Sequence, residues 1–234
     1  MLRQMKSAMR RLVRPPLHRA EIRLPYSVLG TEYGGWPLLK DLTPQKAVIF
    51  SVGVGEDVSF DLAAIERYDA VVHGFDPTPR SAAWVARQNL PAAFHFHAVG
   101  IAAADGEAEF FAPTRDDYVS FSAKPTDGSN LARMVRAPVR RLASLIADLD
   151  GTTPDVLKMD VEGFEYGVLE DMLVGQHRPG QLLVEFHHRM YGIEDALTIQ
   201  HVNQLRVAGY KIFYVSSGGH EYGLVHQALL DKIS

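Results

Sequence analysis

The chain has 234 residues, of which 47% are hydrophobic and 22% are charged. This composition is typical of one globular domain with a short extension. The chain contains no cysteine, which excludes disulfides, zinc–thiolate sites, iron–sulfur clusters and cysteine nucleophiles. Its formal net charge of -4 is uneven, because residues 1–24 hold seven Lys or Arg and one Glu while the remainder is acidic. We therefore expect no broad nucleic-acid-binding surface on the main domain.

The N-terminal segment, residues 1–14, is basic and shows helical spacing of its apolar residues before Pro15 and Pro16. Two interpretations stay open: a helix that frays or packs on the domain, or an amphipathic helix on an anionic membrane or a partner. The segment lacks the apolar core of a secretion signal, and no apolar run is long enough to span a bilayer. We therefore expect a cytoplasmic protein.

The main domain alternates strand and helix patterns. Apolar runs predict strands over 47–52, 70–75, 93–99, 155–159 and 181–186, and helical spacing predicts helices over 58–68, 79–89, 139–148, 166–173 and 195–208. Short excursions at 106–111 and 119–122 flank a loop. The last two strands, 210–215 and 222–227, are joined by a Gly-Gly turn without a helix, which predicts an antiparallel hairpin.

These patterns predict an α/β fold with a mostly parallel seven-stranded sheet, helices on both faces and an antiparallel C-terminal hairpin. In such sheets ligands bind outside the carboxyl ends of the strands. The residues that follow each strand are therefore the candidates for a functional site.

A glycine turn follows the first strand, where Gly53 and Gly55 let the backbone approach a ligand. A dinucleotide fingerprint needs a third glycine, and Val58 stands there instead. Glu56 and Asp57 would repel a pyrophosphate at the start of the helix and favour a cationic ligand. S-adenosylmethionine, with its sulfonium and ammonium groups and no phosphate, is such a ligand. A plain tight turn is the alternative.

Two further strand ends carry candidate cofactor contacts. Asp76, before Pro77, lies about twenty residues after the glycine turn, where an acid can accept the hydroxyls of a ribose; a turn-shaping role is the alternative. Ala98 and Val99 end the third strand, where small residues could form the floor of an adenine pocket.

The strongest segment is the run from Asp155 to Leu169, in which a buried strand leads into Asp160 and Glu162. These carboxylates could bind the ammonium of the cofactor, accept a substrate proton or, with Glu185, hold a Mg²⁺-like ion. We expect Glu165 to complement the helix dipole and the side chain of Lys158 to face away from the site.

The fifth strand ends with Glu185 and His187, which fall on the same side of an extended chain. Together with the preceding carboxylates they could form a general base with an orienting acid, or a metal site. A purely structural histidine pair is the alternative.

The run from Leu157 to Tyr166, with the glycine turn, the Phe-Asp-Pro strand end and the later Glu-Phe-His-His, resembles the FkbM family of methyltransferases over residues 29–227. The resemblance implies a Rossmann-like class I methyltransferase fold and S-adenosylmethionine as cofactor, held by Gly53, Gly55 and Asp76, with Asp160 and Glu162 beside the methyl group. Ser51, included among the cofactor contacts, stands where many Rossmann-like methyltransferases have an acid. The cofactor ammonium would then rely on Glu56, Asp57 or Asp160.

We therefore expect a basic extension (1–24), a cap segment (25–45) and a cofactor-binding catalytic domain (46–234). The resemblance implies O-methylation of a small-molecule, sugar or glycan acceptor, with residues 26–36 and 111–134 shaping the acceptor pocket. Homo-oligomerisation and peripheral membrane contact through the N-terminus stay open. A nucleotide-binding oxidoreductase, a non-catalytic scaffold and a nucleic-acid methyltransferase are the alternatives.

Overall fold

The computed structural model describes residues 15–111 and 134–232. The expected helix at 1–14 and the expected short excursion at 119–122 lie outside these residues. Among the described residues, no helix is both long enough and apolar enough to span a membrane.

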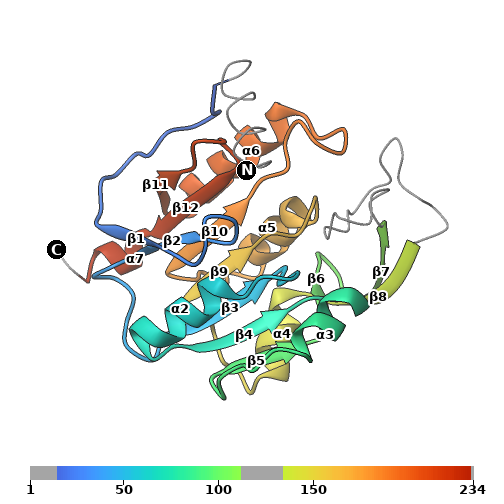
Figure 1. The fold of residues 1–234 in the computed structure, drawn as a ribbon. Helices are drawn as coiled ribbons and strands as arrows, with labels where there is room; N and C mark the ends of the chain where they lie inside the picture. Colours follow the sequence, from blue (N-terminus) through green and yellow to red (C-terminus); the bar gives the residue numbers. More distant parts are fainter. Residues whose placement is uncertain (1–14, 112–133, 233–234) are drawn as a thin grey trace.

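A seven-stranded sheet forms the centre of the molecule, with the order β11-β12-β10-β9-β3-β4-β5 (Figure 1). Its parallel neighbours are β3 (Val48–Val52), β4 (Val71–Phe75), β5 (Phe94–His97), β9 (Val156–Met159) and β10 (Gln181–Glu185). β12 (Glu221–His226) is antiparallel to both β10 and β11 (Tyr210–Val215). The predicted α/β fold with its antiparallel C-terminal hairpin is thus confirmed.

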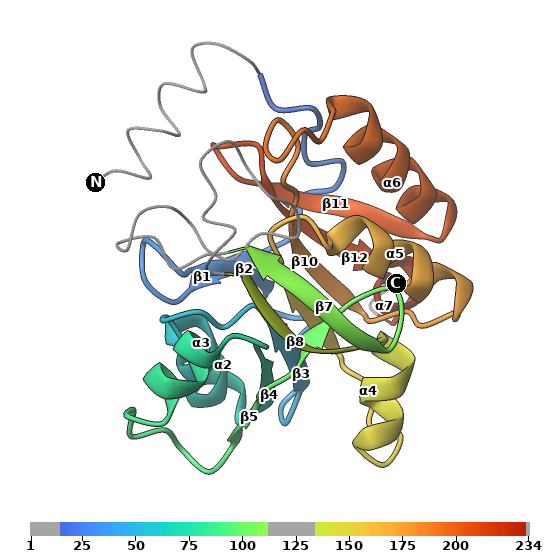
Figure 2. The ribbon, with the colours of Figure 1, turned by 90° about the vertical axis from the view of Figure 1, so that its right-hand side faces the viewer.

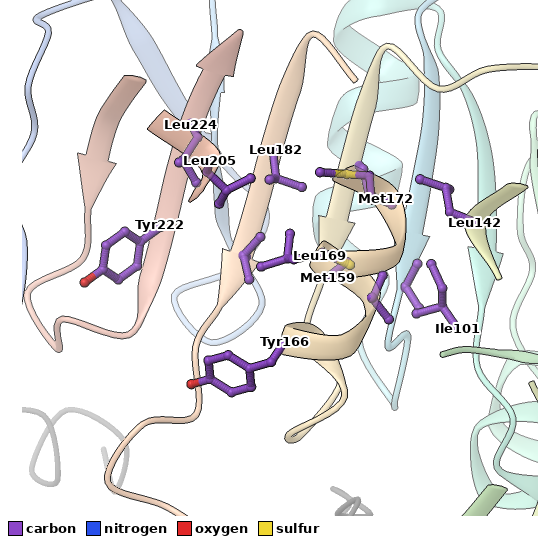
Figure 3. Close-up of a cluster of buried hydrophobic side chains, with 14 of the residues drawn as sticks. Ile101, Leu142, Met159, Tyr166, Leu169, Met172, Leu182, Leu205, Tyr222 and Leu224 are labelled. Carbon is purple, nitrogen blue, oxygen red and sulfur yellow. The ribbon is translucent and has the colours of Figure 1, made fainter. Parts of the chain in front are cut away.

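Helices cover both faces of this sheet and thereby bury its apolar strands on both sides (Figure 2). On one face α4 (Leu142–Asp148), α5 (Glu165–Val174) and α6 (Asp195–Val207) pack on the sheet. Figure 3 shows part of this core, with Leu169 and Met172 of α5 among side chains from the strands. The other face is covered by α2 (Ser59–Tyr68), α3 (Pro79–Val85) and α7 (Gln227–Leu230).

Two small sheets were not expected. β1 (Tyr26–Leu29) and β2 (Trp36–Leu39) form an antiparallel hairpin that packs on the α2 face. β6 (Gly100–Ile101), β8 (Met134–Arg140) and β7 (Gly106–Phe111) form a three-stranded sheet. The predicted helix over 139–148 was therefore wrong at its start: Val139 and Arg140 pair with β6, and the helix begins at Leu142. Pairing with a distant strand overrode the local pattern there.

Candidate active site

A cavity of about 420 Å³ opens at the carboxyl ends of β3, β4 and β9, where ligands bind in open α/β sheets. The β1–β2 hairpin closes one side with Tyr33 and Trp36, and the three-stranded sheet contributes Gly100, Ile101 and Phe110. The lining includes eight of the residues singled out from the sequence: Gly53, Gly55, Glu56, Asp57, Asp76, Pro77, Asp160 and Glu162.

The glycine turn forms the floor of the cavity, and its two glycines serve different purposes. Gly53 has φ +81, and a Cβ there would lie 1.8 Å from the carbonyl oxygen of Asp160. Gly55 has φ +57 with open space where a Cβ would stand. The first glycine therefore permits close packing of two strand ends, while the second permits a left-handed turn beside the cavity.

Asp76 is buried at the end of β4 and is oriented by three donors. Its Oδ2 accepts from the Gly55 amide at 2.9 Å, and its Oδ1 accepts from the amide and hydroxyl of Thr78 at 2.9 and 2.6 Å. A carboxylate has about four lone-pair sites, so the group retains acceptor capacity toward the cavity that it lines.

Three predicted cofactor contacts do not line this cavity. Ser51 is fully buried on the sheet face that α2 covers. Ala98 and Val99 are displaced because β5 ends at His97, and the Val99 amide then donates to the His97 carbonyl in a tight turn. Gly100 and Ile101 occupy the wall in their place.

Glu56 and Asp57 line the cavity, but their carboxylates have partners from the protein. Glu56 forms a two-point ion pair with Arg80 at 2.9 and 3.2 Å, and this hydrogen bond lowers the pKa of Glu56. Asp57 accepts from the Thr31 hydroxyl at 3.0 Å and from the Ser59 amide at 2.7 Å. Asp57 therefore ties the β1–β2 hairpin to the start of α2.

A carboxylate–imidazole cluster lies beside Asp160 at the edge of the cavity. His187 directs its Nε2 toward Glu162 at 3.1 Å and lies 3.7 Å from Asp160, and the Tyr191 hydroxyl donates to the same Glu162 oxygen in a short hydrogen bond. Glu162 adopts a left-handed backbone conformation with φ 50, which is rare for a residue with a side chain. This conformation precedes Gly163 and turns the chain into α5.

Glu165, which we expected to complement the helix dipole, contacts the histidine directly. The Glu165 carboxylate is fully buried and accepts from the amides of His187 and Gly163, both at 2.8 Å, and it lies 3.3 Å from Nδ1 of His187. A carboxylate oxygen of Glu185 also lies within 4.8 Å of a ring nitrogen of His187, so the expected orienting role of Glu185 stays a prediction. Burial alone would lower the pKa of His187, but Glu162 and Glu165 together raise it well above the usual value.

The cluster also contains the acids considered for a metal. Asp160, Glu185 and His187 bring potential ligand atoms within 4.8 Å of one another. Both ring nitrogens of His187 already face carboxylates, and Glu162 accepts from His187 and Tyr191. A divalent ion would have to displace one of these contacts, so the donor set does not fit a metal as it stands and we derive no step through one.

The sequence reasoning missed two charged residues at the site. The expectation that Lys158 faces away was wrong: its side chain lines the cavity and donates to the Gly53 carbonyl at 2.8 Å. Asp61 of α2 also lines the cavity and is buried. A signal existed for Lys158, because a charged residue within an otherwise apolar, buried strand needs a polar partner nearby.

The chain is similar to known methyltransferases. The pattern described as "Methyltransferase FkbM domain" matches residues 50–212. The human "Probable methyltransferase-like protein 24" is 26% identical over 148 residues, which make up 62% of this chain and 34% of the human protein. The chain thus spans about a third of the length of that relative.

Two solved structures are similar to the chain. The FkbM methyltransferase of Methylobacillus flagellatus has a TM-score of 0.47 and 14% identity, covering 77% of this chain and 43% of that one. The fibrillarin pre-rRNA processing protein of Methanococcus jannaschii has a TM-score of 0.49 and 10% identity, covering 81% and 69%. Because the FkbM-domain pattern spans more than half of the sequence, the chain belongs to the FkbM-domain family of methyltransferases.

Proposed function

We propose that the protein transfers a methyl group from S-adenosylmethionine to a hydroxyl oxygen of a sugar, glycan or natural-product acceptor. The observation that carries this proposal is a single cavity that joins the glycine turn, the oriented carboxylate of Asp76 and the carboxylates of Asp160 and Glu162. Asp76 would accept the ribose hydroxyls, and Gly55 leaves room for the ligand beside the turn. Bound S-adenosylmethionine supplies an already activated methyl group, so the protein mainly positions the two reactants.

An alcohol is a poor nucleophile near neutral pH, so a base must accept its proton. Asp160 supports this role better than its neighbours do. His187 does not line the cavity, and both of its ring nitrogens face carboxylates. One oxygen of Glu162 already receives contacts from His187 and Tyr191, which stabilise the carboxylate as an anion and weaken it as a base. Glu165, His187 and Tyr191 thereby position Glu162 next to Asp160.

The cofactor is tested by isothermal titration of the purified protein with S-adenosylmethionine, S-adenosylhomocysteine and NAD. We expect binding of the two adenosyl ligands, weaker binding in Asp76→Ala, and no binding of NAD. Absence of adenosyl binding by a folded sample would refute the proposal and favour a scaffold role, and preferential NAD binding would favour an oxidoreductase.

The reaction is tested with S-adenosylmethionine labelled in its methyl group and a panel of hydroxylated acceptors. We expect label in a product whose NMR spectrum shows a methyl ether. Asp160→Asn should lower turnover by about 10²-fold or more, the usual contribution of a general base, with the melting temperature and S-adenosylhomocysteine affinity retained. Near-normal turnover in that variant would remove Asp160 from the mechanism.

A further inference from the structure

Two opposite charges lie buried under one side of the cavity. Lys158 comes from β9 and is paired in register with Ser51 of β3, and Asp61 comes from the first turn of α2. The side chains of Asp61 and Lys158 are only 2% and 6% exposed, yet both line the cavity. Burial of a charge is costly unless a partner compensates it. Two buried charges that line a cavity therefore indicate a ligand with charged groups.

Lys158 has contacts that hold its ammonium in place without neutralising it. Its Nζ donates to the carbonyls of Gly53 at 2.8 Å and Val52 at 3.4 Å and lies 5.6 Å from the centre of the Trp36 ring. Carbonyl and ring contacts orient a cation, but they carry no negative charge.

Among the described residues, Asp61 has one carboxylate oxygen without a partner. Within the described part of the chain, its buried Oδ1 has no hydrogen-bond partner, and the carboxylate forms no direct ion pair with Lys158. The other acids on this side have partners, since Glu56 pairs with Arg80 and Asp57 accepts from Thr31 and Ser59. Asp61 and Lys158 therefore face the same cavity as two separated, opposite charges.

We propose that Asp61 and Lys158 bind the amino-acid end of the cofactor, with Asp61 accepting from its α-ammonium and Lys158 donating to its α-carboxylate. This inference rests on the proposed use of S-adenosylmethionine. A zwitterion offers one charge to each member of the pair and would give each a directly bonded counter-charge, whereas Lys158 and Asp61 act on each other without a direct ion pair. The pair would also supply a carboxylate from α2 where Ser51 stands in place of the acid that the family resemblance led us to expect on the strand.

The experiment compares four ligands by isothermal titration. S-adenosylhomocysteine carries both charged groups, its decarboxylated analogue keeps only the ammonium, its deaminated analogue keeps only the carboxylate, and 5′-methylthioadenosine has neither. The variants are Asp61→Asn and Lys158→Met, with Lys158→Gln as a second choice if the methionine variant does not fold. Glu66→Gln, on the exposed face of α2, and Lys211→Met, exposed on β11, are matched controls.

Each variant should lose affinity only for the ligands that carry its partner group. We expect Asp61→Asn to weaken the two ammonium-bearing ligands by about tenfold, and Lys158→Met to weaken the two carboxylate-bearing ligands by about tenfold, as for a lost hydrogen bond to a charged group. Binding of 5′-methylthioadenosine should be unchanged, and both controls should match the wild type.

The failure of this inference is distinguishable from failure of the proposed function. If the wild type binds all four ligands equally, or if a variant weakens all four alike, the amino-acid end is not held by this pair while the cofactor assignment stands. If the folded wild type binds none of the four, both the inference and the proposed cofactor are wrong. The wild-type series decides whether the ammonium and carboxylate of the ligand contribute to binding, and the variants decide whether Asp61 and Lys158 are their partners.

Discussion

Replacing Gly53 by alanine should destabilise the protein far more than the same change at Gly55. At Gly53 the new methyl group would lie 1.8 Å from the Asp160 carbonyl, a backbone atom that cannot rotate away. The left-handed conformation adds a cost of about 1–2 kcal/mol for a residue with a side chain, and overpacking adds about 1–3 kcal/mol. We therefore expect Gly53→Ala to lower the free energy of unfolding by about 2–5 kcal/mol, a large part of a typical domain stability of about 5–15 kcal/mol.

Gly55→Ala provides the matched comparison. Its φ is also positive, but no atom lies within 4 Å of the added methyl group, so only the conformational cost of about 1–2 kcal/mol applies. Because Gly55 lines the cavity, its methyl group should instead reduce affinity for S-adenosylhomocysteine.

Urea denaturation followed by circular dichroism measures the stability of both variants, and titration calorimetry measures their binding. We expect Gly53→Ala to shift the urea midpoint strongly and Gly55→Ala to shift it slightly while losing affinity. Equal destabilisation by the two changes would refute the reasoning, because it would show that the contact between Gly53 and Asp160 does not constrain the turn.

Three further predictions concern the pH dependence of stability, the imidazole cluster and metals. Burial raises the pKa of Asp61 from 3.8 to about 6, while Lys158 and Ser51 oppose this rise and Asp57 adds to it. The folded protein therefore holds the Asp61 proton more tightly than the unfolded chain does. This contribution to the free energy of unfolding is present below about pH 4 and is lost as the pH rises to about 6. Asp61→Asn should then be more stable than the wild type at pH 8, by at most about 3 kcal/mol. In urea denaturation the difference between the two proteins should be smaller at pH 5, and equal differences at the two pH values would contradict the raised pKa of Asp61. Glu165→Gln should cost about 1–3 kcal/mol of stability, because it weakens buried hydrogen bonds from the amides of Gly163 and His187. The same variant should reduce the rate of methyl transfer more than the affinity for S-adenosylhomocysteine, and unchanged turnover would show that the position of His187 is irrelevant to the reaction. Dialysis against a strong chelator should leave methyl transfer intact, since the donors around His187 already contact one another, and a loss of activity restored by Mg²⁺ would overturn that expectation.

Local patterns in the sequence were sufficient to predict the main sheet and where its site would lie. Apolar runs separated by helical spacing indicate buried parallel strands because both periodicities are short-range. The carboxyl ends of such strands meet at one edge, so the sequence alone predicts that Gly53, Asp76 and Asp160 lie together. The predicted third strand extended to Ala98 and Val99, whereas the observed strand ends at His97. Local patterns do not show at which residue a turn ends a strand.

Other features depend on contacts between segments far apart in the chain. β1, β2, β6 and β8 form because they pair with partner strands, and pairing of this kind leaves little trace in local composition. Glu165 reaches His187 from a different element, and Asp61 reaches the cavity from α2 while Lys158 comes from β9. The sequence by itself determined the order of elements and the chemistry available at each strand end. Only the tertiary structure decided which acid meets which base, because those distances are set by packing between elements and not by spacing along the chain.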